Sequence, residues 1–525
     1  MGILRPGMPS RTSTTPLPTF RVPLAVLLGA IACWFVFNWT QPAGPGLDPD
    51  AVQYVAAAKS LAANGTLEVP DDSWDSPDSV EPLSHFPPGL STVLAAPVAL
   101  GADPVQAARV VNGIAALVLV ALVFMLVSWA EGRAAGAVAA IAVVVTPAVA
   151  FQFLDVLSEP LFFALMVTTL ACMIWRPRSP IWAGVAASAA ALVRYAGVSV
   201  IAAAGVWSLL LPGTPRQRIR RAVTAGIPGV VTLGAWMVRT RLETHGEGIR
   251  HFSVYGQIAP TLREGVRTLA GWSAPLADGA WRTIPAVIAA CALVVLARDV
   301  LRRWAVRDRL LGSRSATVGD GAERARLVVA ATLVMAACYV AVVVAARLFA
   351  DPAIPLDERL LAPLMLLAMV ALVVTVSNGW RVWRRPARVV AAVLLLGWTA
   401  ASAWATAQEG SYAVETGNDY ADQMWFGSPL IAWVRDHGAG RELYTNYPTA
   451  LYFHANRFSR ALPQAPRPDT ARAFADTVAR EHGLIIAFDR ASRFAASPTA
   501  LMQLVPPPVH VVLRTHDGAI YELPR

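Results

Sequence analysis

Two carboxylates stand close together at the start of a predicted helix, where they could act on a hydroxyl group. Asp48 and Asp50 flank Pro49, and Tyr54 follows Asp50 by four residues. A rigidly held carboxylate can serve as a general base, and the spacing of four places Asp50 and Tyr54 on one helix face. Simpler roles are also open. Asp48 can cap the helix, with Pro49 in its first turn, and Asp50 can merely favour the helix dipole.

Arginines at the ends of apolar runs are the second group of residues that could take part in chemistry. Arg109, Arg194 and Arg359 each lie near such an end. Arginine stays charged and can hold two oxygens of a phosphate, and charge inside a membrane is costly and often functional. An arginine at the end of a span can also simply extend to the interface. We expect Arg194 and Arg359 to bind phosphate, with Asp357 or Glu358 as alternative partners of Arg359. For Arg109 the two interpretations weigh equally.

Glu159 and His85 complete the set of candidate site residues. Glu159 begins an apolar run shortly after Asp155, so it can favour a helix dipole or position a substrate or a metal. His85, with Glu81 nearby, can bind a divalent ion, but the spacing matches no known ligand pattern. A divalent metal ion is therefore one alternative, and no cofactor is predicted with certainty.

The composition indicates which solvent surrounds these residues. Hydrophobic residues make up 55% of the 525 and charged residues only 15%, whereas soluble proteins have about 25% charged residues. The chain carries a net charge of +9. Because the arginines cluster in short loops between apolar runs, they indicate cytoplasmic loops and anionic lipid, and not a nucleic-acid partner.

The apolar runs predict a multi-pass membrane protein with about eleven spans. Either 181–194 and 195–211 are two spans or they form one long tilted helix. The basic short loops all fall on one side if the N-terminus is inside and the C-terminus outside, which predicts this orientation in the cytoplasmic (inner) membrane. The predicted spans are 22–39, 105–129, 134–150, 157–174, 181–194, 195–211, 222–240, 283–297, 327–347, 359–376 and 388–405.

Three regions with different compositions follow from this pattern. Residues 1–20 are rich in Pro, Ser and Thr and are expected to be a disordered cytoplasmic tail. Residues 21–405 form the predicted all-α transmembrane domain, and its long acidic outer loop, 40–104, contains a helix over 47–65. Residues 406–525 have a soluble composition, with strand-like and helix-like runs. They predict a small extracytoplasmic α/β domain.

The order of several short motifs resembles the GT-C superfamily of membrane glycosyltransferases, over about residues 20–405. This superfamily includes the protein O-mannosyltransferases and the lipid A aminoarabinose transferases, which are glycosyltransferase family 39-like proteins. The pattern of Asp50 and Tyr54 in the first outer loop carries the resemblance, together with these segments: His85-Phe86-Pro87-Pro88-Gly89, Arg109 with Asn112, Ser158-Glu159, the stretch 192–197 and the stretch 359–363.

The resemblance implies a hexosyl- or pentosyltransferase that takes a sugar from a polyprenyl-phosphate donor. The acceptor would be an unidentified lipid, glycan or protein of the cell envelope, and membrane lipid would surround the enzyme. In this interpretation Asp50 is the base, assisted by Asp48. The arginines at 109, 194 and 359 bind the donor phosphate, and Tyr54, Glu159 and His85 bind substrate. The alternatives are a transporter or flippase of lipid-linked or envelope precursors, and an assembly protein whose outer tail binds a partner.

Overall fold

The computed structural model describes residues 21–76, 78–244, 253–255, 258–273, 321–350, 354–381, 383–464, 466–490 and 497–524. The predicted tail 1–20 and the predicted span 283–297 lie outside these residues. Each of the other predicted spans falls on a described helix. The apolar runs of the sequence therefore located these helices but not all of their ends: the helix Arg385–Thr416 runs 11 residues beyond the predicted end at 405, and the helix Pro215–Glu243 begins seven residues before the predicted start at 222.

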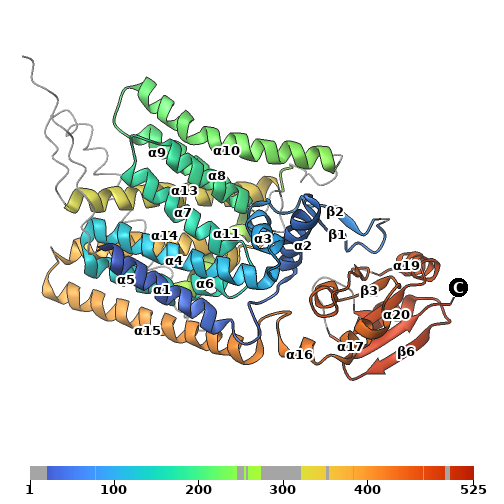
Figure 1. Ribbon diagram of the computed structural model, residues 1–525. Coiled ribbons are helices and arrows are strands. Elements are labelled where there is room, and N and C mark those ends of the chain that lie inside the picture. Colours follow the sequence, from blue (N-terminus) through green and yellow to red (C-terminus); the bar gives the residue numbers. More distant parts are fainter. Residues whose placement is uncertain are drawn as a thin grey trace, which may run out of the picture.

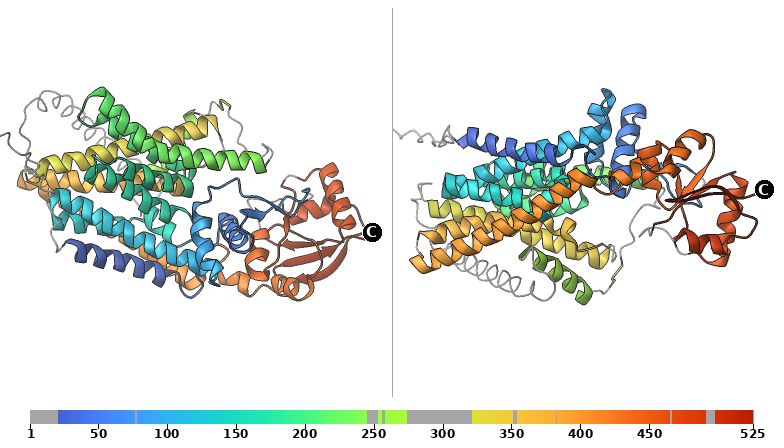
Figure 2. Two further views of the ribbon diagram at one scale, coloured as in Figure 1. Left: turned by 45° about the horizontal axis from the view of Figure 1, so that its top comes forward. Right: turned by 90° about the horizontal axis from the view of Figure 1, so that it is seen from below.

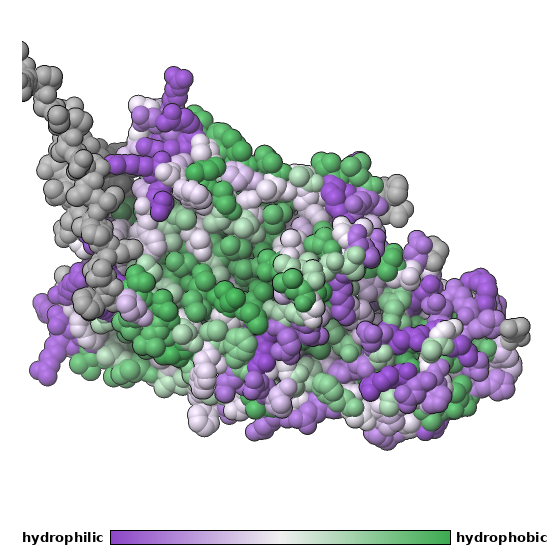
Figure 3. Space-filling view, in the orientation of Figure 1, coloured by the Kyte–Doolittle hydropathy of each residue, from purple (hydrophilic) through white to green (hydrophobic). Residues whose placement is uncertain are grey.

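Long helices lie side by side and form a bundle (Figure 1). Their apolar side chains pack into one continuous core that runs from α1 to α14. On the face seen in Figure 3, hydrophobic residues predominate along the middle of the bundle, and hydrophilic residues gather towards its two ends. The bundle helices are α1 (Arg21–Trp39), α4 (Pro104–Glu131), α5 (Arg133–Val145), α6 (Pro147–Ala150), α7 (Glu159–Trp175), α8 (Ile181–Val193), α9 (Val198–Leu210), α10 (Pro215–Glu243), α13 (Gly321–Phe349), α14 (Glu358–Trp380) and α15 (Arg385–Thr416).

Six of the described helices are long and apolar enough to cross a membrane, and a bent pair raises the number to seven. That pair joins α5 to Pro147–Phe153 with a bend of 69°. Shorter apolar helices, such as α7 and α8, pack inside the bundle. The chain is therefore a multi-pass membrane protein, and the total of about eleven spans remains a prediction.

The apolar stretch 181–211 is broken into two helices. Helix α8 ends at Val193, Arg194 is extended (φ −146°, ψ 139°), and a 3-10 turn at Tyr195–Gly197 leads into α9. The alternative of one long tilted helix is therefore wrong. An extended residue cannot continue a helix, so the break interrupts the span at a charged residue and turns its side chain away from the lipid.

The first outer loop folds as two helices and a hairpin at one end of the bundle (Figure 1). Helix α2 (Pro49–Asn64) has Asp48 as its N-cap and ends at Gly65, whose φ of 74° suits glycine. Strands β1 (Glu68–Pro70) and β2 (Val80–Pro82) pair antiparallel, and α3 (Gly89–Ala99) follows. The helix predicted over 47–65 is confirmed, with its cap.

The C-terminal part contains a five-stranded sheet with the order β4-β3-β5-β7-β6. β3 pairs parallel with β4 and β5, whereas β7 pairs antiparallel with β5 and β6. The sheet lies at the same end of the bundle as α2 and the hairpin (Figure 2). Its strands are β3 (Leu443–Thr445), β4 (Arg460–Ala461), β5 (Leu484–Phe488), β6 (His510–Thr515) and β7 (Gly518–Glu522), and its helices include α17 (Pro429–His437), α19 (Pro468–Arg480) and α20 (Pro498–Leu504).

Candidate active site

The start of α2 holds two carboxylates in different roles. Asp48 Oδ1 accepts a hydrogen bond from the backbone N–H of Asp50 at 2.5 Å, which makes Asp48 the helix cap. Its second oxygen, Oδ2, lies 3.1 Å from Nη1 of Arg359. The capping role and a role in the site therefore coexist, because one carboxylate has two oxygens.

Arg359, at the start of α14, is the hub of the candidate site. Its Nη2 donates to Asp50 Oδ2 at 2.5 Å, its Nη1 donates to Asp48, and its Nε donates to Glu159. Asp357, the predicted alternative partner, instead caps α14 by accepting from the backbone N–H of residue 360 at 2.9 Å. One guanidinium thus joins the first outer loop to the starts of α7 and α14.

Glu159 forms the floor of the site and pairs with a second arginine. Its side chain is 1% exposed, and it forms ion pairs with both Arg359 and Arg194. Nη1 of Arg194 also donates to Ser158 Oγ at 3.1 Å, and this oxygen lies 3.0 Å from the hydroxyl of Tyr54. Glu159 therefore does more than complement a helix dipole: it fixes the positions of both predicted phosphate ligands.

The carboxylate–arginine cluster, defined as Asp48, Asp50, Glu159, Arg194 and Arg359, is unevenly exposed. Exposed fractions are 29% for the side chain of Asp50 and 26% for that of Arg359, against 1% for Glu159. Asp50 and Arg359 are therefore more accessible to a ligand than Glu159. Three carboxylates face two guanidinium groups in this cluster, so the arginines alone do not neutralise it.

This imbalance appears in the ionisation of Asp48. The pKa of Asp48 is raised to about 7, chiefly by burial and also by the nearby charge of Asp50, while Arg359 opposes both. Asp48 therefore changes charge close to neutral pH. A proton on Asp48 would balance the cluster, with two carboxylates against two cations.

Tyr54, Phe86 and His85 form a row of rings beside the cluster. The rings of Tyr54 and Phe86 are 4.9 Å apart, and those of Phe86 and His85 are 4.8 Å apart. Tyr54 is fully buried, and burial raises the pKa of its hydroxyl, with the charge of Glu159 as a smaller cause. The hydroxyl of Tyr54 therefore stays neutral, and it is hydrogen-bonded to Ser158 Oγ. Substrate binding by Tyr54, Glu159 and His85 remains a prediction.

Arg109 lies apart from this cluster. Its Nε donates to Thr40 Oγ1 at 2.8 Å, its Nη2 donates to the carbonyl of Phe37 at 2.5 Å, and its guanidinium lies 5.0 Å from the Phe37 ring. It is buried and joins the end of α1 to the start of α4. These contacts indicate a structural role for Arg109. Nothing in the described geometry supports its predicted contact with the donor phosphate.

A junction of three loops beneath the cluster was not predicted from the sequence. Gly46 forms a parallel bridge with Asp155, and the neighbouring Leu47 forms one with Asp419. Asn418 Nδ2 donates to Asp155 Oδ1 at 3.2 Å. Burial raises the pKa of Asp155 to about 8, and the charge of Asp419 adds to the effect. No local motif marks residues 418 and 419, so only long-range contacts could have revealed them.

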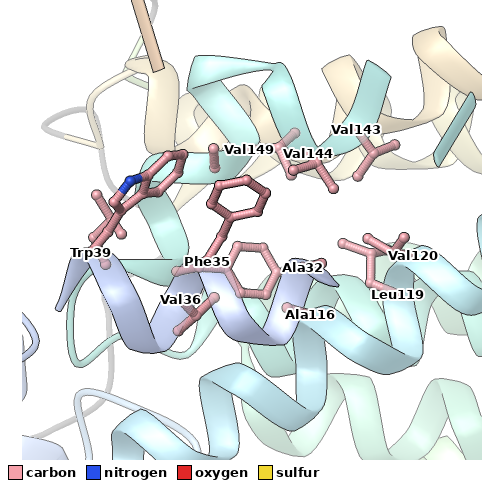
Figure 4. A pocket seen from close by; sticks show the side chains of 13 residues that line it. Ala32, Phe35, Val36, Trp39, Ala116, Leu119, Val120, Val143, Val144 and Val149 are labelled. Atoms are coloured by element: carbon pink, nitrogen blue, oxygen red, sulfur yellow. The ribbon is translucent and has the colours of Figure 1, made fainter. Parts of the chain in front are cut away.

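Two further features bear on ligands. Among the residues described, no group of three or more His, Cys, Asp or Glu side chains is arranged to hold a metal ion. An apolar pocket lies between α1, α4 and α5, lined by residues such as Phe35, Leu119 and Val143 (Figure 4). This lining suits a hydrocarbon chain and offers nothing to a phosphate or a sugar.

Comparison with known proteins identifies the fold. No protein-family model matches the sequence, and no curated protein does. Archaeal oligosaccharyltransferase AglB from Archaeoglobus fulgidus, solved in complex with an inhibitory peptide and a dolichol-phosphate, aligns with a TM-score of 0.50 and 11% identity. The alignment covers 90% of this chain and 70% of that chain.

A second solved structure is similar over nearly the whole chain. The arabinofuranosyltransferase AftD from mycobacteria aligns with a TM-score of 0.53 and 14% identity, over 96% of this chain and 41% of that chain. This chain thus spans less than half the length of that transferase. At such identities the similarity establishes the fold alone. The chain shares its membrane fold with these two glycosyltransferases, which is the fold that the resemblance seen in the sequence implied.

Proposed function

We propose that this protein is a glycosyltransferase that moves a sugar from a polyprenyl-phosphate donor to a hydroxyl-bearing acceptor of the cell envelope. The observation that carries the proposal is the pairing of Asp50 with Arg359 at the exposed side of a buried charge cluster. This arrangement places a carboxylate for a proton next to a cation for a phosphate. Fold similarity alone does not assign chemistry, whereas the cluster supplies the groups that this reaction needs.

The reaction assigns one role to each side of the cluster. Asp50 takes the proton of the acceptor hydroxyl, and the acceptor oxygen forms a bond to the anomeric carbon. The bond from that carbon to the phosphate oxygen breaks, and the lipid phosphate leaves with the electron pair. Arg359 and Arg194 stabilise the negative charge on the leaving phosphate. Attack opposite to the leaving group inverts the anomeric centre.

Arg359 links donor binding to the release of the base. In the present contacts Nη2 of Arg359 neutralises Asp50, and a paired carboxylate is a poor base. A donor phosphate that bonds to Arg359 competes for the same N–H groups. Asp50 is then freed when the donor is in place. Glu159 remains bonded to Arg194 during this exchange, so the floor of the site keeps its charge balance.

The proposed location is the outer face of the cytoplasmic membrane. Helix α2, which contains Asp50, lies at the end of the bundle that carries the β1–β2 hairpin and the C-terminal sheet (Figure 1), and the basic short loops of the sequence favour the opposite end as cytoplasmic. A lipid-linked donor suits this location because nucleotide sugars do not cross the membrane. The dolichol-phosphate in the similar oligosaccharyltransferase is a ligand of the same chemical class.

The proposal is tested by transfer with the purified full-length protein. We expect sugar transfer from a polyprenyl-phosphate sugar to an envelope extract, measured by mass spectrometry of the products, and its loss in Asp50→Asn. A transporter or flippase would move labelled lipid between leaflets equally well with Asp50→Asn. Leaflet movement without transfer would overturn the proposal.

A further inference from the structure

A second pocket lies beside the candidate site, between α2, the β1–β2 hairpin and the C-terminal part. It encloses about 410 Å³ of empty space, including its open mouth. Three segments far apart in the sequence supply its wall, and the lining residues with polar or aromatic side chains are Gln53, Asp72, Thr449, Tyr452, Phe458 and Ser459.

Two of the residues that line this pocket carry a buried polar atom without a partner. Oγ of Ser459, a residue that is 3% exposed, and Oε1 of Gln53 are buried and have no hydrogen-bond partner. A buried polar group without a partner costs free energy. Gln53 Oε1 can only accept a hydrogen bond, whereas a serine hydroxyl both donates and accepts. A ligand that carries several hydroxyl groups satisfies both requirements.

The remaining lining distinguishes between classes of ligand. Tyr452 and Phe458 offer aromatic surface, and Asp72 offers a carboxylate. Among the described residues that line the pocket there is no Lys or Arg. Lys59 lies next to the pocket, with its Nζ 5.2 Å from the centroid of the Tyr452 ring, but the charged side chain among the described lining residues is that of Asp72, which disfavours an anionic ligand. The chemistry therefore matches a neutral sugar, which presents apolar C–H faces to aromatic rings and hydroxyl groups to polar atoms.

The pocket adjoins the candidate base. Gln53 follows Asp50 by three residues on α2, and on a helix such residues are neighbours, with Cβ atoms about 5–6 Å apart. Pro49, immediately before Asp50, also lines the pocket. A sugar unit held at Gln53 therefore keeps the adjoining unit of the same molecule close to Asp50.

We propose that this pocket binds a neutral sugar unit of the acceptor, so that the acceptor is a glycan with at least one uncharged residue beside the reacting hydroxyl. The identification of the bound sugar as part of the acceptor rests on the proposed function, whereas the binding of a neutral sugar does not depend on it. Ser459 and Gln53 hold the hydroxyl groups, and Asp72 excludes anionic sugars.

The test measures sugar binding to the full-length protein in phosphatidylcholine nanodiscs by saturation-transfer NMR. The probes are isomaltotriose, mannotriose and arabinotriose as neutral trisaccharides, and trigalacturonate as the anionic counterpart. We expect at least one neutral trisaccharide to bind and trigalacturonate to bind about 10-fold more weakly or not at all. Comparable binding of trigalacturonate, or no binding of any neutral probe, would overturn the inference.

Variants locate the binding in this pocket. Ser459→Leu fills it and Gln53→Leu removes an acceptor, so each should weaken neutral-sugar binding about 10-fold. Ser60→Leu, on the same helix but outside the lining, is the matched control. Melting temperatures show whether each variant is folded. If folded Ser459→Leu and Gln53→Leu proteins both bind as well as the control, the site is wrongly placed and the inference falls.

Asp50→Asn separates this inference from the proposed function. This variant should bind the neutral trisaccharide normally while losing transfer. If the unsubstituted protein binds the neutral sugar but transfers nothing, the proposed function alone is contradicted. If the unsubstituted protein transfers sugar but binds no neutral trisaccharide, the assignment of the pocket alone is contradicted.

Discussion

Nη2 of Arg359 lies 2.5 Å from Oδ2 of Asp50, so the proposed phosphate ligand neutralises the proposed base. The same guanidinium also holds Asp48 and Glu159. A single side chain is thus paired with all three carboxylates of the cluster.

Replacing Asp50 by Asn should reduce transfer about 100-fold or more, because an amide cannot accept the acceptor's proton. Folding should be unaffected, since the helix cap is Asp48. Initial rates with a polyprenyl-phosphate sugar measure the effect. Asp48→Asn is the matched control: asparagine also caps helices, so this variant should keep most of the activity. Equal losses in the two variants would contradict the assignment of Asp50 as the base.

Replacing Arg359 by Lys should weaken binding of the donor phosphate, because lysine has no planar fork of donors for two oxygens. We expect about a 10-fold rise in the Kd for undecaprenyl phosphate, measured by native mass spectrometry. Arg239→Lys is the control, since Arg239 donates to the carbonyls of Leu83 and Leu67 and lies outside the cluster. A similar rise in both variants would indicate a general loss of positive charge.

Arg109→Gln should lower stability and leave donor binding unchanged. Arg109 holds Thr40 and the carbonyl of Phe37 at the junction of α1 and α4, and the loss of hydrogen bonds to a charged group costs about 1.5–3 kcal/mol each. Thermal unfolding in detergent measures the first effect and lipid-phosphate binding the second. A variant with normal melting temperature but weak phosphate binding would restore Arg109 to the donor site.

Stability should fall as the pH rises from about 4 to 8, partly because of Asp155. The pKa of Asp155 is raised from 3.8 to about 8 in the folded protein. Between these values the unfolded chain has released a proton that the folded protein keeps, so a rising pH favours unfolding. In Asp155→Asn the fall in melting temperature should be shallower. Asp78→Asn, at an exposed position, is the control, and parallel curves for all three proteins would contradict the prediction.

Gly46→Ala should disrupt the junction of three loops. A Cβ atom at this position would lie 1.8 Å from Oδ1 of Asp155 and 2.7 Å from Cβ of Asn418. Neither neighbour can move without breaking a contact of the junction, and such overpacking typically costs about 1–3 kcal/mol. We expect a lower melting temperature together with reduced transfer. Gly205→Ala, where a Cβ meets no atom within 4 Å, should be neutral in both measurements.

The sequence predicted the local parts of this site well. The cap at Asp48, the proline after it and Gly65 at the other end defined α2, because these signals act within one helix. Arg194 and Arg359 stood out since charge beside an apolar run is costly. Both lie in the cluster.

The remaining features depend on contacts between distant segments. The pairing of Arg359 with Asp50 joins residues 309 positions apart, and the bridge from Leu47 to Asp419 joins loops that carry no motif. The structural contacts of Arg109 could not be predicted either, because a sequence motif identifies a residue but not the residues that it contacts. Periodicity and capping say nothing about which loops meet.

The bridge between Leu47 and Asp419 has a consequence for biosynthesis. The loop that carries Asp48 is made early by the ribosome, but one of its supports is made only after the long helix α15. Until residue 419 has crossed to the same side of the membrane, the segment before α2 lacks this partner. A stalled or truncated nascent chain would therefore hold its carboxylates loosely, and catalytic competence would come late in membrane insertion.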